Sequence, residues 1–367
     1  MTDILLVLNT GSSSVKFRIF GAAADLPLLA DGRVTGIGTA PVFTVKGETP
    51  RELPQDLTQK QALQYVLDWI DAADDGRHVV AAGHRIVHGG GVFCAPVLLT
   101  PEVLDRLDGF VPLAPLHQPH NLAAVRALAE IYPGLKQIGC FDTAFHAGHD
   151  AVADCFALPE KLREEGVRRY GFHGLSYEGT AHFLAQEGKI PPRVVVAHLG
   201  NGASLCAMKN GKSIDTTMGM TALDGLPMGT RCGALDPGVL IYLLRTGMSP
   251  DALEEMLYHD AGLKALSGGV SDMKALLEDG GEKAVFAVDY FTRKVTQYIA
   301  MMAASLGGLD LLVFTGGIGE NAAPVRRAVT EGLAFLKPFD VRVVGADEER
   351  VIARHILEFL SQEQEKS

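Results

Sequence analysis

The sequence predicts an α/β protein built from two similar halves. Apolar stretches of strand length alternate with helical stretches along the first half, which is typical of the α/β class. An apolar strand, a polar turn of small residues and a returning strand occur at residues 4–20 and again at residues 193–208. This repeat indicates an internal duplication. A chain of 367 residues is long enough for two or three domains, each with its own core.

The first half opens with a predicted β-hairpin whose turn is Asn9–Ser14. Small residues let the backbone N–H groups of this turn approach an anion, and Lys16 adds a positive charge. An ordinary structural turn is the alternative. Further strands are expected at residues 33–45, 79–87 and 137–141, the last leading into Asp142. Helices are expected to begin at the capping box of Thr58 and Gln61, and at Thr100 and Pro101.

The second half carries two more glycine-rich turns at the ends of apolar strands. The first is His198–Ser204, and the other is Thr315–Asn321, with Asn321 expected to cap the next helix. Three such turns favour a nucleotide held between the halves, although neither a Walker A motif nor a dinucleotide-binding G-x-G-x-x-G is present. Asn210-Gly211 predicts a hairpin turn. Helices are expected at residues 282–306, before Gly307-Gly308, and at 347–360.

The composition indicates a cytoplasmic protein. The net charge of −11 gives no support for nucleic-acid or anionic-membrane binding. The five cysteines are scattered, with no C-x-x-C pair, which favours free thiols in a reducing compartment. No basic leader precedes the first apolar run, and no apolar segment approaches ~20 residues, so neither a signal peptide nor a membrane span is expected.

Seven motifs, in order along the chain, resemble those of the acetate kinase family. Two are long signatures, Asn9–Phe17 and His198–Ser204. The other five are His84–Gly90, Phe141–His146, Tyr170–Gly174, Met228–Arg231 and Gly317–Asn321. Because the motifs run nearly from end to end, the chain is identified as a member of this family.

The resemblance implies the actin-like ATPase fold, with two ribonuclease-H-like domains and a nucleotide cleft between them. The expected N-terminal domain is residues 1–145 together with a C-terminal helix at 350–367, and the nucleotide-binding domain is residues 146–349. The implied reaction is the reversible transfer of the γ-phosphoryl group of ATP to acetate, giving acetyl phosphate and ADP. Mg²⁺ is the implied cofactor, with Mn²⁺ as an alternative. Family members form homodimers, and the same is expected here.

Cationic side chains are required because the reaction brings a carboxylate against a polyphosphate. Two like charges ~4 Å apart repel by roughly 4 kcal/mol at an effective dielectric constant of 20. Arg85 and Arg231 match the family arginines that serve the carboxylate and the transferring phosphoryl group, and guanidinium binds both in fork geometry. His173 matches the histidine that stabilises the equatorial phosphoryl oxygens.

Asp142 is expected to act through a magnesium site, although the family pattern also allows a general base. Acetate, with a pKa of roughly 4, is already ionised at neutral pH and needs no base. Asn9 and Glu348 match the family positions associated with Mg²⁺, which takes one or two carboxylates together with water and phosphate oxygens. An acidic helix N-terminus is the alternative interpretation of Glu348.

The resemblance also assigns two groups of residues to the nucleotide. The phosphate group is Ser12, Ser14, Lys16, His198, Leu199, Gly200, Asn201 and Gly202. The adenosine group is Asp272, Met273, Lys274, Gly317, Ile318, Gly319, Glu320 and Asn321. Lys274 stands where an arginine is usual, which would weaken stacking on adenine and loosen the nucleotide preference.

An apolar pocket for the acyl group is implied at Val87, Leu116, Phe172 and Ala222. Ala222 stands where the family usually has a proline, so the pocket is expected to be larger. One extra methylene changes discrimination by only ~1–3 kcal/mol, so we expect appreciable use of propionate. Propionate kinase and butyrate kinase are therefore the alternatives within the enzyme class.

Two alternatives come from other classes of protein. A non-catalytic actin-like ATPase module would share the fold and the phosphate turns, but would not need Arg85, Arg231 and His173. A zinc hydrolase is suggested by the pair His84 and His88. Against it, residues 79–87 are predicted as a strand, no glutamate flanks the pair as in H-E-x-x-H, and Arg85 would repel a cation.

Overall fold

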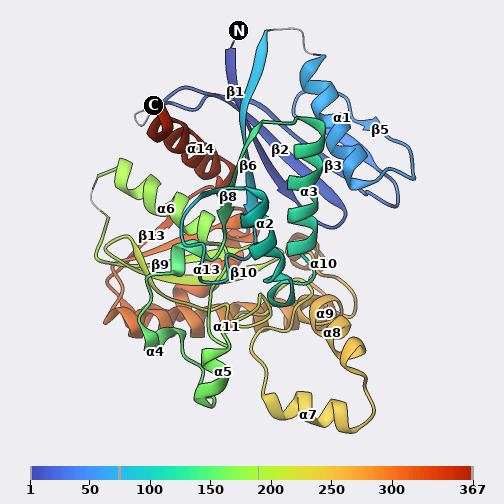
Figure 1. Cartoon of the computed structure of the whole chain (residues 1–367). Coiled ribbons are helices and arrows are strands. Elements are labelled where there is room, and N and C mark those ends of the chain that lie inside the picture. Colours follow the sequence, from blue (N-terminus) through green and yellow to red (C-terminus); the bar gives the residue numbers. More distant parts are fainter. Residues whose placement is uncertain (1, 73–75, 189, 365–367) are drawn as a thin grey trace. The chain divides into compact units, whose positions relative to one another are not determined.

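The computed structural model describes residues 2–72, 76–188 and 190–364 (Figure 1). It divides into two compact units, one of Met1–Ala144 with Asp347–Ser367 and the other of Phe145–Ala346. The predicted domains, residues 1–145 with the helix at 350–367 and residues 146–349, stay a prediction. Over the described ranges, no helix is both long and apolar enough to cross a membrane.

The first unit contains an eight-stranded sheet in the order β5-β4-β3-β2-β1-β6-β8-β7. Its strands are β1 (Thr2–Thr10), β2 (Ser14–Gly21), β3 (Leu28–Thr35), β4 (Val42–Val45), β5 (Arg51–Glu52), β6 (Arg77–Ile86), β7 (Val97–Leu98) and β8 (Lys136–Phe141). Its α-helices are α1 (Gln59–Asp71), α2 (Pro101–Asp108), α3 (Gln118–Ile131) and α14 (Glu348–Gln364). The short 3-10 helix η1 is Val111–Leu113, and η2 (Ala144–His146) lies at the boundary of the units.

The hairpin predicted at residues 4–20 is confirmed. Strands β1 and β2 pair antiparallel from Ile4 with Gly21 to Thr10 with Val15. Strand β1 also pairs parallel with β6, and β6 pairs parallel with β8. The carboxyl ends of three strands, at Thr10, Ile86 and Phe141, therefore meet at one edge of the sheet.

Helices cover both faces of this sheet. On one face, Leu63 and Val66 of α1 pack with Phe17 and Phe43 of the strands, and the predicted capping box of Thr58 is confirmed. On the other face α14 packs on β1 and β6 (Figure 1). A Cβ atom at Gly83 of β6 would lie 2.7 Å from Cδ1 of Ile356, so this close approach requires glycine.

The second unit contains a five-stranded sheet in the order β11-β10-β9-β12-β13. Its strands are β9 (Arg193–Leu199), β10 (Ala203–Lys209), β11 (Lys212–Thr216), β12 (Leu311–Thr315) and β13 (Asp340–Val343). Its helices are α4 (Ala151–Asp154), α5 (Glu160–Glu164), α6 (Gly174–Gln186), α7 (Pro237–Arg245), α8 (Pro250–His259), α9 (Gly262–Ser267), α10 (Met273–Asp279), α11 (Glu282–Leu306), α12 (Gly316–Asn321), α13 (Ala323–Gly332) and η3 (Ala334–Leu336).

The two sheets share a five-strand core, which confirms the internal duplication. The order β3-β2-β1-β6-β8 in the first unit corresponds to β11-β10-β9-β12-β13 in the second. In each core the central strand pairs antiparallel with the returning strand of its hairpin and parallel with the strand on its other side. Each central strand therefore delivers its glycine-rich turn at the same edge as the end of a parallel neighbour.

The helices of the second unit begin and end largely where the sequence predicts. Helix α11 spans Glu282–Leu306 and ends at Gly307 with a positive φ of 74°, as expected. The expectation for Asn321 is wrong: residues 316–321 are themselves helical, and the Asn321 amide donates to the Gly317 carbonyl. Helix α13 begins after Ala322 instead.

Candidate active site

Arg85, Asp142 and Glu348 form a buried ionic cluster in the first unit. Arg85 lies near the end of β6 and Asp142 directly follows the parallel strand β8, so both side chains start from one edge of the sheet. The guanidinium donates two hydrogen bonds to Asp142, from Nε to Oδ1 at 3.0 Å and from Nη2 to Oδ2 at 2.8 Å. Its Nη1 lies 3.0 Å from a carboxylate oxygen of Glu348, the first residue of α14.

This cluster carries more negative than positive charge. The side chains of Arg85, Asp142 and Glu348 are 20%, 3% and 12% exposed. Burial by itself would lower the pKa of Arg85, but the charges of Asp142 and Glu348 outweigh it and raise that pKa. Burial also raises the pKa of Asp142, and the Arg85 charge opposes this shift. One guanidinium between two carboxylates leaves a net charge of −1 when all three are ionised.

The first glycine-rich turn lies at the same edge of the sheet. Asn9 and Lys16 are register partners in the hairpin, and Ser12 and Lys16 are exposed. No carboxylate within the described ranges forms an ion pair with Lys16, so its ammonium group is available to an anion. Asn121 was missed by the sequence analysis: its amide donates to the Thr10 carbonyl at 2.7 Å and accepts from the backbone N–H of Val87 at 3.1 Å. A polar residue among the apolar positions of a helix, here α3, is the signal that could have found it.

In the second unit the turn after β9 lies beside the turn after β12. Strands β9 and β12 are parallel, and His198 pairs with Thr315 in the register. A Cβ atom placed on Gly200 would lie 3.9 Å from both the Gly317 backbone nitrogen and Nε2 of His198. The backbones of two glycine-rich turns and an imidazole therefore meet here, an arrangement that suits a phosphate site.

His173 and Arg231 approach this turn at Gly202. A Cβ atom on Gly202 would lie 3.3 Å from Nε2 of His173 and 3.9 Å from Nη1 of Arg231. The His173 and His198 rings stack with centroids 4.2 Å apart. The segment carrying Arg231 is fixed to the same turn, because the N–H of Gly229 donates to the Asn201 carbonyl at 3.1 Å.

Arg231 is a largely buried cation that bonds a carbonyl and faces an aromatic ring. Its Nη1 donates to the Ala222 carbonyl at 3.3 Å, and its Cζ lies 5.9 Å from the centre of the Tyr258 ring. Burial lowers the pKa of this guanidinium, and Tyr258 opposes the shift. Within the residues that the structure describes, no carboxylate lies in ion-pairing distance. A buried charge of this kind is costly unless an anionic ligand compensates it.

The residues assigned to adenosine lie on α10 and α12. Asp272 caps α10 by accepting from the Ala275 N–H at 2.9 Å, and Met273 is buried. Lys274 is exposed and lies 3.8 Å from Glu278 on its own helix. Glu320 accepts from the backbone N–H groups of Gly316 and Ala346 at 3.1 and 3.0 Å, so its carboxylate stabilises the turn. The remaining members of this group, Gly317, Ile318, Gly319 and Asn321, form α12 itself.

The residues of the expected acyl pocket belong to different units. Val87 and Leu116 are half-buried in the first unit. Phe172 is buried next to His173, and Ala222 is half-buried with its carbonyl on Arg231 in the second unit. The structure therefore brings together Phe172, Ala222, His173 and Arg231 in one unit, and Arg85, Asp142 and Glu348 in the other.

The two histidines that suggested zinc, His84 and His88, lie in different surroundings. His84 is buried on β6, where burial lowers its pKa to about 4. Nδ1 of His88 accepts from the Gly90 N–H at 2.9 Å. In the part of the chain that the structure describes, no three His, Cys, Asp or Glu side chains are arranged to hold a metal ion.

The duplicated sheet core with glycine-rich turns is that of the actin-like ATPase fold, and the chain is a phosphotransferase that acts on a carboxyl group. It belongs to the acetokinase family, whose model matches residues 4–354. It is 45% identical to an acetate kinase of Rhodopseudomonas palustris (strain TIE-1), over 97% of this chain and 98% of the relative. These matches confirm the resemblance found in the motifs.

Two solved structures are similar over almost the whole chain. An acetate kinase of Porphyromonas gingivalis superimposes with a TM-score of 0.87 at 35% identity, covering 98% of this chain and 100% of that one. A propionate kinase of Francisella tularensis subsp. tularensis SCHU S4 gives a TM-score of 0.90 at 34% identity, covering 96% and 98%. The predicted fold class is thereby confirmed. It is shared by an acetate kinase and a propionate kinase.

Proposed function

We propose that this chain is an acetate kinase that transfers the γ-phosphoryl group of ATP to acetate. A carboxylate oxygen of acetate forms a bond to the γ-phosphorus, and the bond from that phosphorus to the β,γ-bridging oxygen breaks. The bond electrons leave with ADP, so no proton needs to move. The reverse reaction returns the phosphoryl group to ADP.

Arg231 is the observation that carries this proposal. This largely buried guanidinium has no carboxylate partner among the described residues. Its place beside His173 and the Gly202 turn suits an oxyanion whose charge shifts during the reaction. Phosphoryl transfer depends mainly on positioning and on electrostatic stabilisation of the equatorial oxygens. We assign this task to Arg231 and His173, with the backbone of His198, Leu199, Gly200, Asn201 and Gly202 holding the phosphates.

Asp142, Glu348 and Asn9 are proposed to hold Mg²⁺. These side chains offer oxygen donors, which this hard cation prefers, and two carboxylates with water and phosphate oxygens are sufficient for it. The net charge of −1 at the Arg85 cluster supports the proposal, because a divalent cation would change it to +1 and so favour anionic substrates. When bound, the ion neutralises charge on phosphate oxygens. In this proposal Arg85 orients both carboxylates.

The function is tested by trapping acyl phosphate with hydroxylamine in the presence of ATP and Mg²⁺. Acetate, propionate and butyrate are supplied in parallel, and the hydroxamate formed is measured. We expect acetate to give hydroxamate in proportion to the ADP released. If none of the three acids gave hydroxamate, the kinase function itself would be excluded.

The acyl specificity is expected to be broad because of Ala222. We predict that kcat/KM for propionate lies within about a hundredfold of that for acetate, since one methylene is worth only ~1–3 kcal/mol. The matched variant is Ala222→Pro, which adds ring volume but keeps the carbonyl that accepts from Arg231. It should lower the propionate-to-acetate ratio of kcat/KM. A wild-type ratio below one in a hundred would contradict the prediction.

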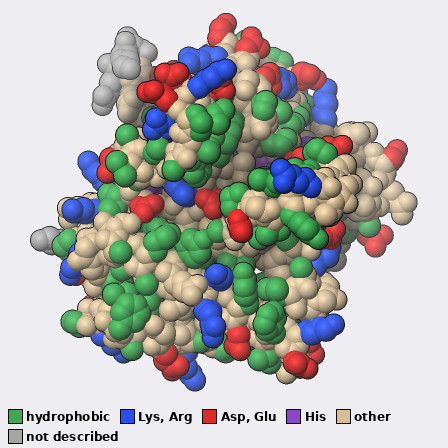
Figure 2. All heavy atoms as spheres, turned by 90° about the horizontal axis from the view of Figure 1, so that it is seen from below, with side chains coloured by type: hydrophobic (Ala, Val, Ile, Leu, Met, Phe, Trp, Pro, Cys, Tyr) green, Lys and Arg blue, Asp and Glu red, His purple; other side chains and the backbone are tan. Residues whose placement is uncertain are grey.

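We also propose that the protein is a cytoplasmic homodimer, in line with the resemblance. Free thiols support a reducing compartment, since Cys94, Cys155, Cys206 and Cys232 form no disulfide. Exposed hydrophobic side chains support self-association (Figure 2), among them Val239, Ile241, Tyr242 and Leu244 on α7 and Val285 and Phe286 on α11. Light scattering tests this by comparing the mass in solution with the 39.2 kDa of one chain.

A further inference from the structure

We propose that Ser204 is a positioning residue that holds the neutral imidazole of His173 with its ring proton on Nε2. This inference rests on the proposed function, in which His173 stabilises the transferring phosphoryl group. It adds the reason why an uncharged histidine would present a hydrogen-bond donor, rather than an acceptor, to the phosphoryl oxygens. The tautomer of a histidine is decided by the hydrogen bond that its other ring nitrogen makes.

Ser204 connects His173 to a buried tyrosine. It is the second residue of β10, and its side chain is fully buried. Its Oγ lies 2.8 Å from Nδ1 of His173 and is also hydrogen-bonded to the hydroxyl group of Tyr177, which is fully buried on α6. Three polar groups from two elements therefore form a chain in the order Tyr177, Ser204, His173.

The direction of this chain follows from acidity. Either hydroxyl group can donate in this bond, but a phenol, with a pKa near 10, is a better donor than an alcohol, which favours donation from Tyr177 to Ser204 Oγ. The single proton of Ser204 is then directed to Nδ1 of His173. Nδ1 must accept, and in a neutral ring the proton therefore lies on Nε2. Hydrogen bonds in such a chain polarise and strengthen one another.

Nε2 of His173 lies beside the Gly202 turn, where the transferring phosphoryl group is proposed to bind. It would lie 3.3 Å from a Cβ atom on Gly202, and Nη1 of Arg231 lies on the same side, 3.9 Å from that position. Oriented donors that need not reorganise during the reaction are the most effective at stabilising developing charge. The bond from Ser204 would prepare such a donor before substrate arrives.

The backbone of His173 supports a fixed ring orientation. His173 has φ 58° and ψ 23°, a left-handed conformation that residues other than glycine rarely adopt. Its ring stacks on His198 at an interplanar angle of 20°. Nδ1 of His198 is in turn 2.8 Å from Oγ of Ser176 on α6. Each ring is thus held by a serine of another element, which keeps both Nδ1 atoms engaged.

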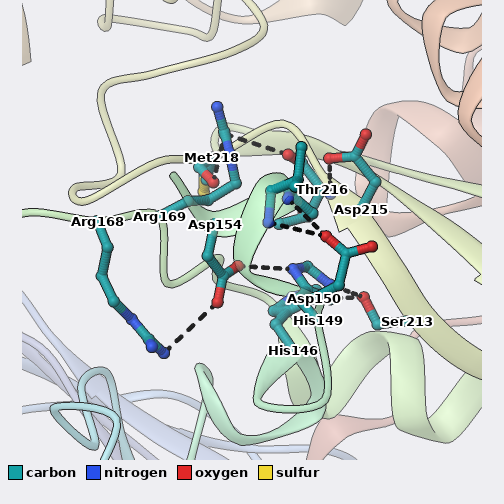
Figure 3. Close-up of polar contacts among 12 residues, drawn as sticks. His146, His149, Asp150, Asp154, Arg168, Arg169, Ser213, Asp215, Thr216 and Met218 are labelled. Atoms are coloured by element: carbon teal, nitrogen blue, oxygen red, sulfur yellow. Dashed lines mark hydrogen bonds and ion pairs between the residues drawn. The ribbon is translucent and has the colours of Figure 1, made fainter. Parts of the chain in front are cut away.

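A second serine bonded to histidines offers a matched control. Ser213 on β11 lies between His146 and His149 (Figure 3), with Oγ 2.8 Å from Nδ1 of one and 2.7 Å from Nε2 of the other. His149 is also hydrogen-bonded to Asp154 at 3.0 Å, so Ser213, His149 and Asp154 are connected as in the Ser-His-Asp triad of a hydrolase. Ser213 is only 4% exposed and also accepts from Cys206 Sγ, so it is held as a structural residue rather than presented as a nucleophile.

The experiment compares Ser204→Ala, Tyr177→Phe and Ser213→Ala with the wild-type chain, by steady-state kinetics and by ¹⁵N NMR of histidine-labelled protein. The His173 signals are assigned from their loss in His173→Asn. In the wild type we expect a protonated Nε2 and an unprotonated Nδ1. Ser204→Ala should lower kcat about tenfold to a hundredfold, with KM for ATP and acetate changed less than about threefold. Its His173 should show a mixture of tautomers.

Tyr177→Phe removes only the first donor of the chain, so its kcat should fall about threefold to tenfold with the same change in tautomer. Ser213→Ala should lower Tm and leave kcat/KM within about threefold. A wild-type His173 protonated on Nδ1, or a folded Ser204→Ala variant with wild-type kcat, overturns the proposal. If Ser204→Ala does not fold, the proposal is tested by the tautomer of His173 in the wild type and by kcat and the tautomer in Tyr177→Phe. A wild-type proton on Nδ1, or an unchanged kcat and tautomer in Tyr177→Phe, then overturns it. Absence of hydroxamate from the wild type would instead reject the proposed function, because the tautomer is measured without turnover.

Discussion

Replacing Arg231 with methionine is expected to lower kcat/KM for ATP and acetate at least about a thousandfold, as the loss of an arginine that stabilises a transferring phosphoryl group does. The same change should leave Tm unchanged or slightly higher. Methionine fills a similar volume, and the change removes a largely buried charge for which residues 2–72, 76–188 and 190–364 provide no carboxylate partner. Loss of activity without loss of stability is the mark of a residue retained for its ligand.

Arg169→Met is the control for this prediction. In the wild type, Nη1 of Arg169 donates to the carbonyls of Thr216, Thr217 and Met218 at 3.0–3.2 Å and to the Asp224 carboxylate at 3.3 Å. Figure 3 shows part of this set. Removing these bonds should cost about 1–3 kcal/mol of unfolding free energy, because buried acceptors lose their donor. Its kcat/KM should change far less than that of Arg231→Met. The assignment of Arg231 fails if its variant keeps activity within tenfold of the wild type.

Local signals in the sequence predicted most of the fold. The capping box at Thr58 and the glycines after Leu306 are short-range patterns, and the structure places helix ends at both. The duplicated hairpins were recognisable because alternating apolar residues flank small-residue turns. Residues 316–321 were the exception. Glycine is a poor helix former, yet this segment is helical because the Glu320 carboxylate accepts the N–H of Gly316 and that of Ala346, 26 positions away.

The sequence predicted which residues form the candidate site, but it did not predict which of them contact one another. Arg85 and Asp142 lie 57 positions apart, and nothing local to either indicates that the guanidinium would be held by two carboxylates. The same holds for Ser204, which closes the His198–Ser204 motif but bonds a histidine 31 positions earlier. Contacts of this kind depend on which strands become neighbours. A motif therefore shows which chemistry is present, while the topology decides which groups share a proton or a charge.

Replacing Asp142 with asparagine is expected to lower kcat at least about a hundredfold and to raise the Mg²⁺ concentration for half-maximal rate about tenfold or more, as the loss of a ligating carboxylate does. KM for acetate should change little, because the acyl group of acetate is expected in the apolar pocket rather than at the proposed Mg²⁺ ligands. The amide keeps the size of the side chain, and the ion pair between Arg85 and Glu348 remains. The cost in unfolding free energy should therefore be about 1–3 kcal/mol, less than for a buried charge left entirely unpaired.

Glu349→Gln is the matched control, since it makes the same chemical change at the next residue along α14. Glu349 forms its ion pair with Arg18, at 3.4 Å, and acts on Arg85 only as the weakest of the charges that raise its pKa. Its variant should therefore keep kcat and the Mg²⁺ dependence within about threefold, since half-exposed ion pairs contribute little. The Mg²⁺ titration separates the two roles that the sequence left open for Asp142. A general base would lose kcat at every Mg²⁺ concentration, with an unchanged midpoint. A metal ligand would shift the midpoint, and that shift is what a site with a charge of −1 around Arg85 leads us to expect.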